Sequence, residues 1–278
     1  MKLIYPTVEL WHQNDAINHV AKCARVCYAS EVDNPDSNIK LVKSLENKGH
    51  LSMFRHETKC FIVPKKDNPN WQGIYNELRK FVYCPFIQFI QYNGRIYCCT
   101  NGHLWRYLKD HTIVERLSPY EVSVGIFNQT EIGWKLMRYT FCLITSIRVS
   151  RELNRVSPNN IAEQSTRYVD FGKRGGITIC LPHWWIGSPW YIKTAFKTYW
   201  KICEIAYKLA LKVGFKPEDA SGLLPLQTAT KVVYTYSVDE WKHIIDLRYH
   251  GTTGKPHPDA KRVIGLVRLY LQDEGYEL

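Results

Sequence analysis

Residues Ser150 to Tyr168 have the sequence SRELNRVSPNNIAEQSTRY, a polar stretch between two apolar, aromatic regions. Within it, Glu163, Ser165 and Arg167 recur at a spacing of two residues. In an extended chain this spacing predicts that all three side chains point to one side. A carboxylate, a hydroxyl and a guanidinium that converge suit an anionic, hydrogen-bonding ligand such as a nucleotide. The alternative is an ordinary polar surface strand, because alternation is the usual signal of a half-buried strand.

Length and composition limit the class of protein. The chain has 278 residues, 45% of them hydrophobic, and we expect a single domain over residues 1–278. No run of about 18 apolar residues occurs in it, so we expect no membrane partner. The first residues, MKLIYPTVELWHQND, lack the apolar segment and cleavage site of a secretory signal, so we expect a cytoplasmic protein. The nine cysteines show neither CxxC spacing nor a Cys/His zinc pattern, which predicts reduced thiols, no disulfides and no metal site.

The charge balance indicates anionic partners. The formal net charge is +11, which suits nucleic acid but equally suits small anionic substrates or cofactors. The 37 Lys and Arg residues are spread along the chain without a basic tail or a long basic run. This distribution makes a nucleic-acid partner the less favoured alternative.

The spacing of apolar residues predicts a mixture of helices and strands. The predicted helices span residues 14–28, 37–48, 103–109, 151–155, 190–213 and 259–272, and a further one follows a capping box at residues 237–240. The predicted strands lie in the second half of 50–63 and at 137–147, 177–181 and 230–236. Asn93-Gly94, between two apolar runs, predicts a hairpin with a type I′ turn.

Several local details follow from these patterns. We expect Ser150 to cap the helix at 151–155 and Pro158 to end it. The apolar stripe of the helix at 190–213 is expected to comprise Ile192, Ala195, Phe196, Tyr199, Ile202 and Ala206. In the helix after the capping box, Arg248 falls at the far end of the buried face, where it needs a partner or a ligand. The alternative is that Arg248 extends to solvent.

Three separated segments together resemble one family, the flavin-dependent thymidylate synthases. Residues 50–56, HLSMFRH, are similar to the family's His-x-Ser/Thr-x-Phe-Glu-His segment, and ARVCYAS at 24–30 precedes them as in the family. The opening stretch resembles the signature Arg-His-Arg, followed seven residues later by Ser within Glu-x-Ser-x-Arg-Tyr. Residues 223–248, LLPLQTATKVVYTYSVDEWKHIIDLR, are similar to the family's Leu-Pro to Leu-Arg close. An aromatic-rich insertion, at about 65–135, separates the first segment from the signature.

The resemblance implies an α/β (α+β) fold, in which an antiparallel sheet is flanked by helices, and a homotetramer with active sites where subunits meet. It also implies reductive methylation of dUMP to dTMP. In that reaction methylenetetrahydrofolate gives the carbon, NADPH reduces FAD, and the reduced flavin delivers the hydride. The basic charge suits these anionic ligands. No Rossmann GxGxxG motif occurs, so a flavin would be held by side chains and interfaces.

The resemblance also implies roles for individual residues. The residues expected to hold the uracil nucleotide are Glu163, Ser165, Arg167, Arg155 and Arg248. The residues expected to contact the flavin are His50, Ser52 and Arg155. Ser165 and Arg248 are expected to act in catalysis.

The chain departs from the family's pattern at four positions. Val156 and Ser157 stand where the signature has His and Arg, Arg55 replaces a Glu, and Ser221 replaces an Arg that helps to hold the nucleotide phosphate. Two lost cations cost about 1.5–3 kcal/mol each if nothing replaces them. The candidates for replacing them are Arg55, Arg151, Lys173 and a cation of the insertion.

Two alternatives to dUMP methylation stay open at this point. The first is a related folate- and flavin-dependent reaction, such as hydroxymethylation, on dUMP or another pyrimidine nucleotide, which the mass of the product distinguishes. The second is a catalytically inactive protein that binds nucleotides or nucleic acid, for which the aromatic insertion supplies stacking surfaces. Salt-dependent binding to oligonucleotides would support it. The insertion's aromatic residues equally suit additional core or subunit contacts.

Overall fold

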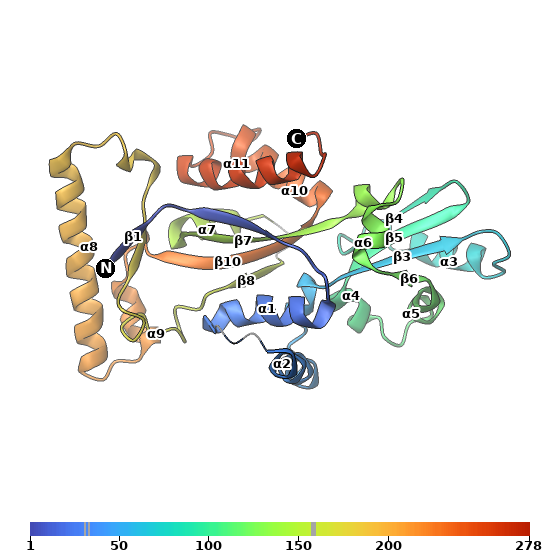
Figure 1. Ribbon diagram of the computed structural model, residues 1–278, viewed down its shortest axis with the longest axis horizontal. Coiled ribbons are helices and arrows are strands. Elements are labelled where there is room, and N and C mark those ends of the chain that lie inside the picture. Colours follow the sequence, from blue (N-terminus) through green and yellow to red (C-terminus); the bar gives the residue numbers. More distant parts are fainter. Residues whose placement is uncertain (31, 33, 157–159) are drawn as a thin grey trace.

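The computed structural model describes residues 1–30, 32, 34–156 and 160–278. At its centre is a four-stranded antiparallel sheet in the order β2-β7-β10-β8 (Figure 1). Its strands are β2 (Thr7–Trp11), β7 (Arg138–Ser146), β8 (Ile161–Glu163) and β10 (Ala229–Ser237). The two central strands pair along their whole lengths, with Arg138 opposite Ser237 and Ser146 opposite Ala229. Because neighbouring residues of a strand point to opposite faces, each central strand contributes side chains to two cores.

Helices cover both faces of this sheet, as Figure 1 shows. One face carries α7 (Ile147–Leu153), α10 (Val238–Ile245), the π-helical turn η6 (Asp246–His250) and α11 (Pro258–Asp273). The other face carries α1 (Ala16–Tyr28), with α2 (Pro35–Asn47) and the 3-10 helix η1 (Leu51–His56) packed beside it. Val232 belongs to the first core and Val233 to the second. We call these the α11 face and the α1 face.

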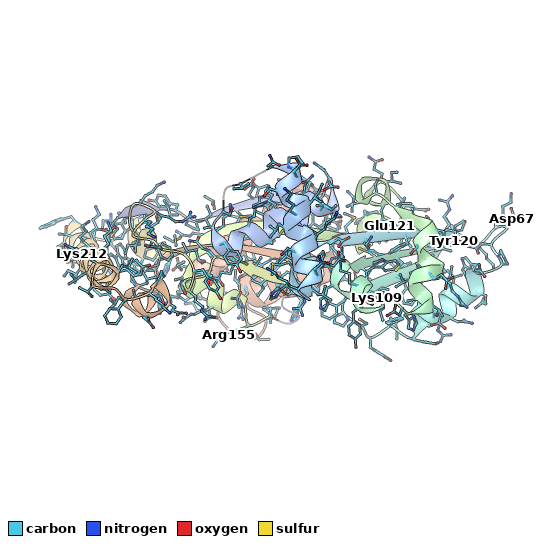
Figure 2. The ribbon with its side chains drawn as sticks, turned by 90° about the horizontal axis from the view of Figure 1, so that it is seen from below. Asp67, Lys109, Tyr120, Glu121, Arg155 and Lys212 are labelled. Carbon is cyan, nitrogen blue, oxygen red and sulfur yellow. The ribbon has the colours of Figure 1, made fainter. Side chains whose placement is uncertain are left out.

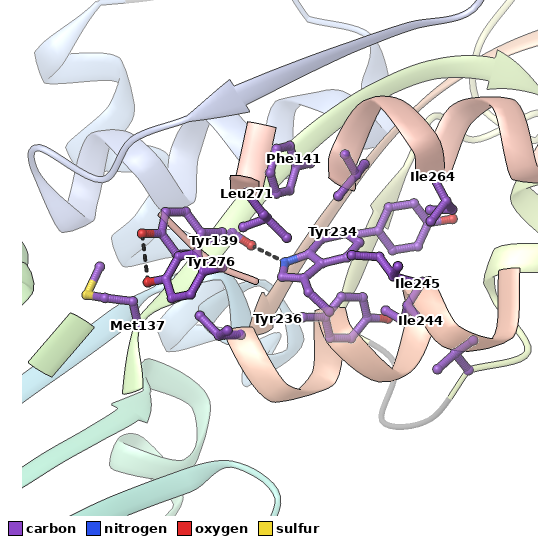
Figure 3. Close-up of a cluster of buried hydrophobic side chains, with 14 of the residues drawn as sticks. Met137, Tyr139, Phe141, Tyr234, Tyr236, Ile244, Ile245, Ile264, Leu271 and Tyr276 are labelled. Atoms are coloured by element: carbon purple, nitrogen blue, oxygen red, sulfur yellow. Dashed lines mark hydrogen bonds between the residues drawn. The ribbon is translucent and has the colours of Figure 1, made fainter. Parts of the chain in front are cut away.

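Aromatic side chains dominate the core of the α11 face (Figure 3). The ring of Phe141, fully buried on β7, meets the Trp241 ring edge-on at 5.1 Å between centroids. Trp241 Nε1 donates to the carbonyl of Tyr139 at 3.0 Å, and the hydroxyls of Tyr139 and Tyr276 lie 3.0 Å apart. Buried Trp and Tyr side chains are stable where their polar atoms find such partners. The contacts tie α10 and the C-terminal residues to β7.

The insertion, together with the strand β3 that precedes it, builds a second four-stranded antiparallel sheet in the order β4-β5-β3-β6. Its strands are β3 (Thr58–Pro64), β4 (Ile87–Tyr92), β5 (Arg95–Asn101) and β6 (Glu121–Val122). The helices of this part are α3 (Trp71–Arg79), α4 (Gly102–Tyr107), α5 (Thr112–Leu117), η2 (Ser118–Tyr120), α6 (Val124–Asn128) and η3 (Gly133–Leu136). Trp71, Ile74 and Leu78 of α3 pack on this sheet and form a core separate from those of the central sheet.

The third part of the chain lies at the opposite end of the molecule (Figure 1). It contains a short parallel pair, β1 (Lys2–Ile4) with β9 (Thr178–Cys180). Its helices are η4 (His183–Trp185), α8 (Trp190–Lys212), α9 (Pro217–Ala220) and η5 (Ser221–Leu223). Figure 2 shows Lys212, at the end of α8, and Asp67, in the insertion, at opposite ends of the molecule.

The structure confirms the predicted fold class, since antiparallel sheets are flanked by helices. The hairpin is also confirmed, because Asn93 and Gly94 join β4 to β5 with φ values of 45° and 69°, as a type I′ turn requires. The capping box is confirmed by reciprocal bonds between Ser237 and Glu240. None of the helices in the described ranges is long and apolar enough to cross a membrane.

Two local predictions were wrong. Ser146, and not Ser150, caps the short helix, whose span is Ile147–Leu153; Pro158 lies outside the described residues. The predicted apolar stripe of α8 does not pack against the rest of the protein, since Tyr199 and Ile202 are 53% and 59% exposed. The helix buries its opposite side instead, where Trp200 and Tyr207 enter a core and the carboxylate of Glu204 accepts from Ile177 N at 3.2 Å and Lys201 Nζ at 2.6 Å.

The central core gives a stability prediction. Replacing Phe141 with alanine removes a fully buried ring between β7 and α10. We expect the free energy of unfolding to fall by about 3–5 kcal/mol in urea titrations. Tyr83→Ala is the control, because Tyr83 is 96% exposed and its loss should change this quantity by less than about 0.5 kcal/mol. Equal losses in the two variants would contradict the packing described for the core.

Candidate functional site

Glu163, the last residue of β8, is held in a polar network on the α11 face. It lies opposite Val232 of β10, whose side chain belongs to the core of that face. Its carboxylate accepts hydrogen bonds from Ser150 Oγ at 2.7 Å, Thr230 Oγ1 at 3.1 Å and Asn154 Nδ2 at 3.2 Å. These bonds fix the carboxylate without a cation and leave it acceptor capacity for a ligand, since two carboxylate oxygens offer about four acceptor sites.

Sequence reasoning missed the partners of Glu163. Ser150 had been expected to cap a helix, and Asn154 and Thr230 carried no signal of their own. Asn154 is itself oriented by the buried hydroxyl of Tyr234, which donates to Asn154 Oδ1 at 2.7 Å. The strand pairing that brings Thr230 and Tyr234 beside Glu163 spans about 70 residues of sequence. Only the alternation along β10 could have suggested that Thr230 and Tyr234 share a face.

Ser165 and Arg167 do not continue the extended chain. The strand ends at Glu163, and residues 166–168 form a turn, so the prediction that three alternating side chains share one side of a strand was wrong. Two hydrogen bonds explain this turn: Ser165 N donates to the carbonyl of Cys27, which is far away in the sequence, and Ser165 Oγ accepts from Arg167 N at 3.1 Å. Such serine turns compete with extended structure. Arg167 is exposed, and its Nε lies 2.6 Å from Glu218 Oε2.

Arg155 follows α7 and lies at the edge of the molecule (Figure 2). Its side chain is 69% exposed and contacts Glu152 at 3.3 Å. The next residue, Val156, is buried in the core of the α11 face, and Ser157 lies outside the described residues. The position at which the family's signature carries a histidine is therefore part of the hydrophobic core in this chain.

The segment at residues 50–56 lies on the α1 face, where η1 packs against α1, β8 and β10. Phe54 and His56 are buried, whereas His50 and Ser52 are exposed. Among the described residues, neither His50 nor Ser52 has a side-chain hydrogen-bond partner. The two side chains are thus free to contact a ligand.

His56 anchors η1 to the sheet through a buried chain of hydrogen bonds. His56 Nδ1 lies 2.7 Å from Thr235 Oγ1, which lies 2.7 Å from Thr140 Oγ1, and this atom is 3.0 Å from His19 Nε2. Burial lowers the pKa of His56 to about 3, an effect that His19 and Arg138 strengthen. Burial also lowers the pKa of His19 to about 4. Both histidines are therefore neutral at pH 7.

Arg248 lies in η6, between α10 and α11 on the α11 face. Its Nε is buried and has no hydrogen-bond partner among the described residues. A buried donor without a partner is unfavourable, and π-helical turns are frequent at functional sites. The expectation that Arg248 needs a ligand or another partner is therefore supported by its surroundings.

The structure brings some of the predicted residues together and separates others. Glu163, α7 and Arg248 share the α11 face, whereas His50 and Ser52 lie on the α1 face. Ser221, which replaces an Arg of the family, donates its hydroxyl to the Glu218 carbonyl at 2.8 Å. It therefore lies beside the residue that pairs with Arg167.

Arg55, Arg151 and Lys173 are the three named residues among the four candidates for replacing the lost cations. Arg151 and Lys173 are exposed, on α7 and in the turn before β9, and carry no carboxylate partner within 4 Å in the described chain. Arg55 lies in η1, and its carbonyl accepts from Arg138 Nη2 at 3.0 Å. Arg55 shares η1 with Ser52, and Arg151 lies on α7, which Arg155 follows, whereas Lys173 lies six residues after Arg167.

The hydrogen-bond donors at the predicted flavin-binding positions suit the polar part of a flavin, but they do not form a single binding site within one chain. His50 and Ser52 offer uncommitted side chains, and Arg155 an exposed guanidinium, which match phosphate and ring carbonyl oxygens. They fit FAD if residues of the two faces meet across a subunit contact. No group of three or more His, Cys, Asp or Glu side chains suited to a metal ion occurs in the described ranges.

Part of the chain matches a family of known proteins. Residues 133–260 match the family described as thymidylate synthase complementing protein, which confirms the resemblance for the second and third of the three segments. The match includes Arg155, Glu163, Ser165, Arg167 and Arg248. No curated protein matches the chain.

Two solved structures of one protein are similar to the chain in fold. Both are of the UMP/dUMP methylase PolB from Streptomyces cacaoi, one bound with 5-Br dUMP and the other with 5-Br UMP. The first is 16% identical, with a TM-score of 0.48, over 98% of this chain and 93% of that chain. The second is 15% identical, with the same TM-score, over 98% and 92%.

The buried histidines give a prediction of pH dependence. The folded chain excludes protons from His19 and His56, whereas the unfolded chain binds them below about pH 6.5. We therefore expect the free energy of unfolding to fall between pH 6.5 and 4, by up to about 1.4 kcal/mol per pH unit for each histidine. His56→Asn should make this slope shallower in urea titrations at a series of pH values.

The control for this measurement is His243→Asn, which removes an exposed histidine of α10. It should leave the slope unchanged. A His56→Asn variant with the full slope of the parent would show that His56 does not exclude a proton in the folded state.

Proposed function

We propose that this chain, which matches the thymidylate synthase complementing protein family over residues 133–260, catalyses the reductive methylation of dUMP to dTMP. The observation that carries the proposal lies within the matched segment. Glu163 is held in a fixed network on the face of the sheet where the buried guanidinium nitrogen of Arg248 has no partner among the described residues. A fixed carboxylate and an unpartnered cation suit the N–H and carbonyl groups of a pyrimidine and the charge of its phosphate.

In this proposal, each nucleotide-binding residue has a chemical task. Glu163 accepts a hydrogen bond from the pyrimidine N–H, and Ser165, whose oxygen accepts from Arg167 N, keeps its own hydrogen to donate. Arg248 stabilises negative charge that develops on a ring carbonyl during transfer, since preorganised donors act most strongly on such charge. Arg167 and Arg155, both exposed, bind the phosphate.

Methylenetetrahydrofolate supplies the carbon, and NADPH supplies the electrons. FAD, when bound, carries the hydride, so the protein's own part is binding, orientation and electrostatics. His50, Ser52 and Arg155 are the residues proposed to hold it. A protein that leaves the redox step to its cofactor needs no nucleophile–base pair of its own.

We propose further that the active enzyme is a homotetramer. One chain places His50 and Ser52 on one face of the central sheet and Glu163 and Arg248 on the other, which supports a site completed by a second copy. The helix α8, which lies at one end of the molecule (Figure 1), offers a surface for this contact, because it carries exposed apolar residues at helical spacing. They include Ile202, Ile205 and Leu209, which are 56–59% exposed. Exposed apolar stripes of this length mark interaction sites in soluble proteins.

The purified protein should carry a flavin absorbance band or take up FAD, and should convert dUMP to dTMP with NADPH and methylenetetrahydrofolate. Mass analysis of the nucleotide product distinguishes a methyl from a hydroxymethyl group. A protein that stays colourless after incubation with FAD, and that leaves dUMP unchanged, would refute the proposed reaction.

The role of Arg248 gives a prediction for a variant. Arg248→Gln removes the charge of a buried donor, and charge-assisted hydrogen bonds contribute about 1.5–3 kcal/mol. We therefore expect kcat/KM for dUMP to fall about 10- to 100-fold in the methylation assay.

Arg95→Gln is the matched control for this variant, because Arg95 is exposed at the start of β5. It should retain the activity of the parent. Unfolding curves of both variants check that the fall in activity does not result from loss of the folded structure. If the folded Arg248→Gln variant kept the activity of the parent, Arg248 would not be part of the site.

The assembly gives a second prediction. Ile205→Glu combined with Leu209→Glu puts two charges on the outward side of α8, and burying them in a contact is costly. We expect the parent to have the mass of four chains in light scattering and the variant a smaller mass. Val82→Glu, at a 62% exposed position of the insertion, should leave the mass unchanged. A parent that scatters as a single chain would contradict the assembly.

A further inference from the structure

A cationic pocket lies on the α1 face of the central sheet, away from Glu163. Its volume is about 290 Å³. The residues that line it are Trp11, Lys22, Arg25, Val26, Ala29, Ser30, Val32, Asn38, Gln164, Arg174 and Lys231. Gln164 and Lys231 directly neighbour Glu163 and Thr230 in sequence, but they point to the other face because side chains alternate along the strands. The pocket is therefore distinct from the candidate nucleotide site.

Two arginines of the pocket are held in place by neutral partners. Arg25 donates from Nη2 to Ser37 Oγ at 2.9 Å and to Asn38 Oδ1 at 2.9 Å. Arg174 donates to the Ala29 carbonyl at 2.5 Å. These bonds orient the guanidinium groups without cancelling their charge, which is the arrangement of a preorganised anion site.

Two lysines that line the pocket lie near one aromatic ring. Lys22 Nζ lies 3.9 Å from the centroid of the Trp11 ring, and Lys231 Nζ lies 5.3 Å from it. Trp11 itself is 6% exposed, and its Nε1 is buried without a hydrogen-bond partner among the described residues. Each cation gains from the ring, but the two ammonium groups repel each other. An anion bound in the pocket, which both lysines line, would reduce that repulsion.

Carboxylates do not neutralise the pocket within the described chain. None of the four cations has an Asp or Glu oxygen within 4 Å there, and no acidic residue lies among the described lining residues. Glu9 is two residues from Trp11 on β2 and so points to the same face, but it is exposed and does not line the pocket. Glu31 and Asp33 lie outside the described residues.

We propose that this pocket binds the diphosphate group of a small-molecule ligand, separately from the nucleotide that Glu163 and Arg248 hold. Four cations from α1, β10 and the turn before β9 exceed the charge of one phosphate dianion, so two linked phosphates match them better. Guanidinium groups bind phosphate oxygens in pairs, and ammonium groups act as point charges beside them. The diphosphate belongs either to inorganic pyrophosphate or to the chain of a nucleoside di- or triphosphate.

The test is calorimetric titration of the full-length protein with inorganic pyrophosphate, inorganic phosphate and dTTP. Pyrophosphate should bind more tightly than phosphate, and Lys22→Gln combined with Lys231→Gln should weaken its binding at least about tenfold. Lys22→Arg combined with Lys231→Arg keeps both charges and should keep the affinity within a few-fold. Binding of dTTP tighter than that of pyrophosphate identifies a nucleotide as the source of the diphosphate, and the reverse order identifies the inorganic ion.

Lys40→Gln combined with Lys43→Gln is the matched control, because it removes two charges from exposed positions of α2 that do not line the pocket. This control should bind pyrophosphate like the parent. If this control lost binding to the same extent, the effect would be one of general charge, and the proposed site would be refuted. A parent protein that binds no pyrophosphate at low salt would also refute it.

Two further outcomes separate this pocket from the proposed enzyme. In Arg248→Gln, pyrophosphate binding should persist while dUMP turnover falls, so failure of one proposal leaves the other standing. If FAD alone binds, and Lys22→Gln with Lys231→Gln abolishes that binding, the pocket is a part of the flavin site and the separate diphosphate site is refuted.

Discussion

The pairing of β7 with β10 is the constraint on which the rest of the structure depends. Both strands are nine residues long and pair residue for residue, with β2 bound to the outer edge of one and β8 to the outer edge of the other. Each buries side chains on two faces, so a shift of one residue would exchange the two cores. The register is thereby fixed, and with it the places of Thr230, which holds Glu163, and of Lys231, which lines the cationic pocket. The position of a residue along the paired strands therefore decides which face, and so which site, its side chain reaches.

Sequence patterns predicted those elements whose causes are local. The hairpin at Asn93-Gly94, the capping box at Ser237 and the two central strands depend on neighbouring residues, and each occurs as predicted. The turn at Ser165 was missed because its cause is a bond to Cys27, far away in the sequence. The prediction of which side of α8 packs against the rest of the protein was also wrong. That helix has apolar residues on more than one side, so spacing could not tell which side packs within the chain and which is left exposed.

The departures from the family's signature have different physical meanings. Val156 is buried beside Leu153 in the core, where the histidine of the signature would place a polar side chain among apolar ones. This departure is therefore one of packing. Ser221 is different, since it supports the backbone of Glu218, whose carboxylate is the present partner of Arg167. A nucleotide phosphate must displace that carboxylate to reach Arg167. The cost is small, because exposed ion pairs contribute about 0–1 kcal/mol.

The end of β8 serves both candidate sites, because Glu163, its last residue, points to one face, and Gln164, the residue after it, lines the pocket on the other. Sharing a strand does not by itself couple the two. Coupling requires an element with two arrangements whose balance both ligands shift. The paired strands between the sites are buried on both faces and are joined to η1 and α1 by the hydrogen bonds of His56, Thr235, Thr140 and His19. This close packing opposes a second arrangement of the strands. Occupation of the two faces should then be independent, unless the turn after Glu163, which carries Ser165 and Arg167, moves with the ligand.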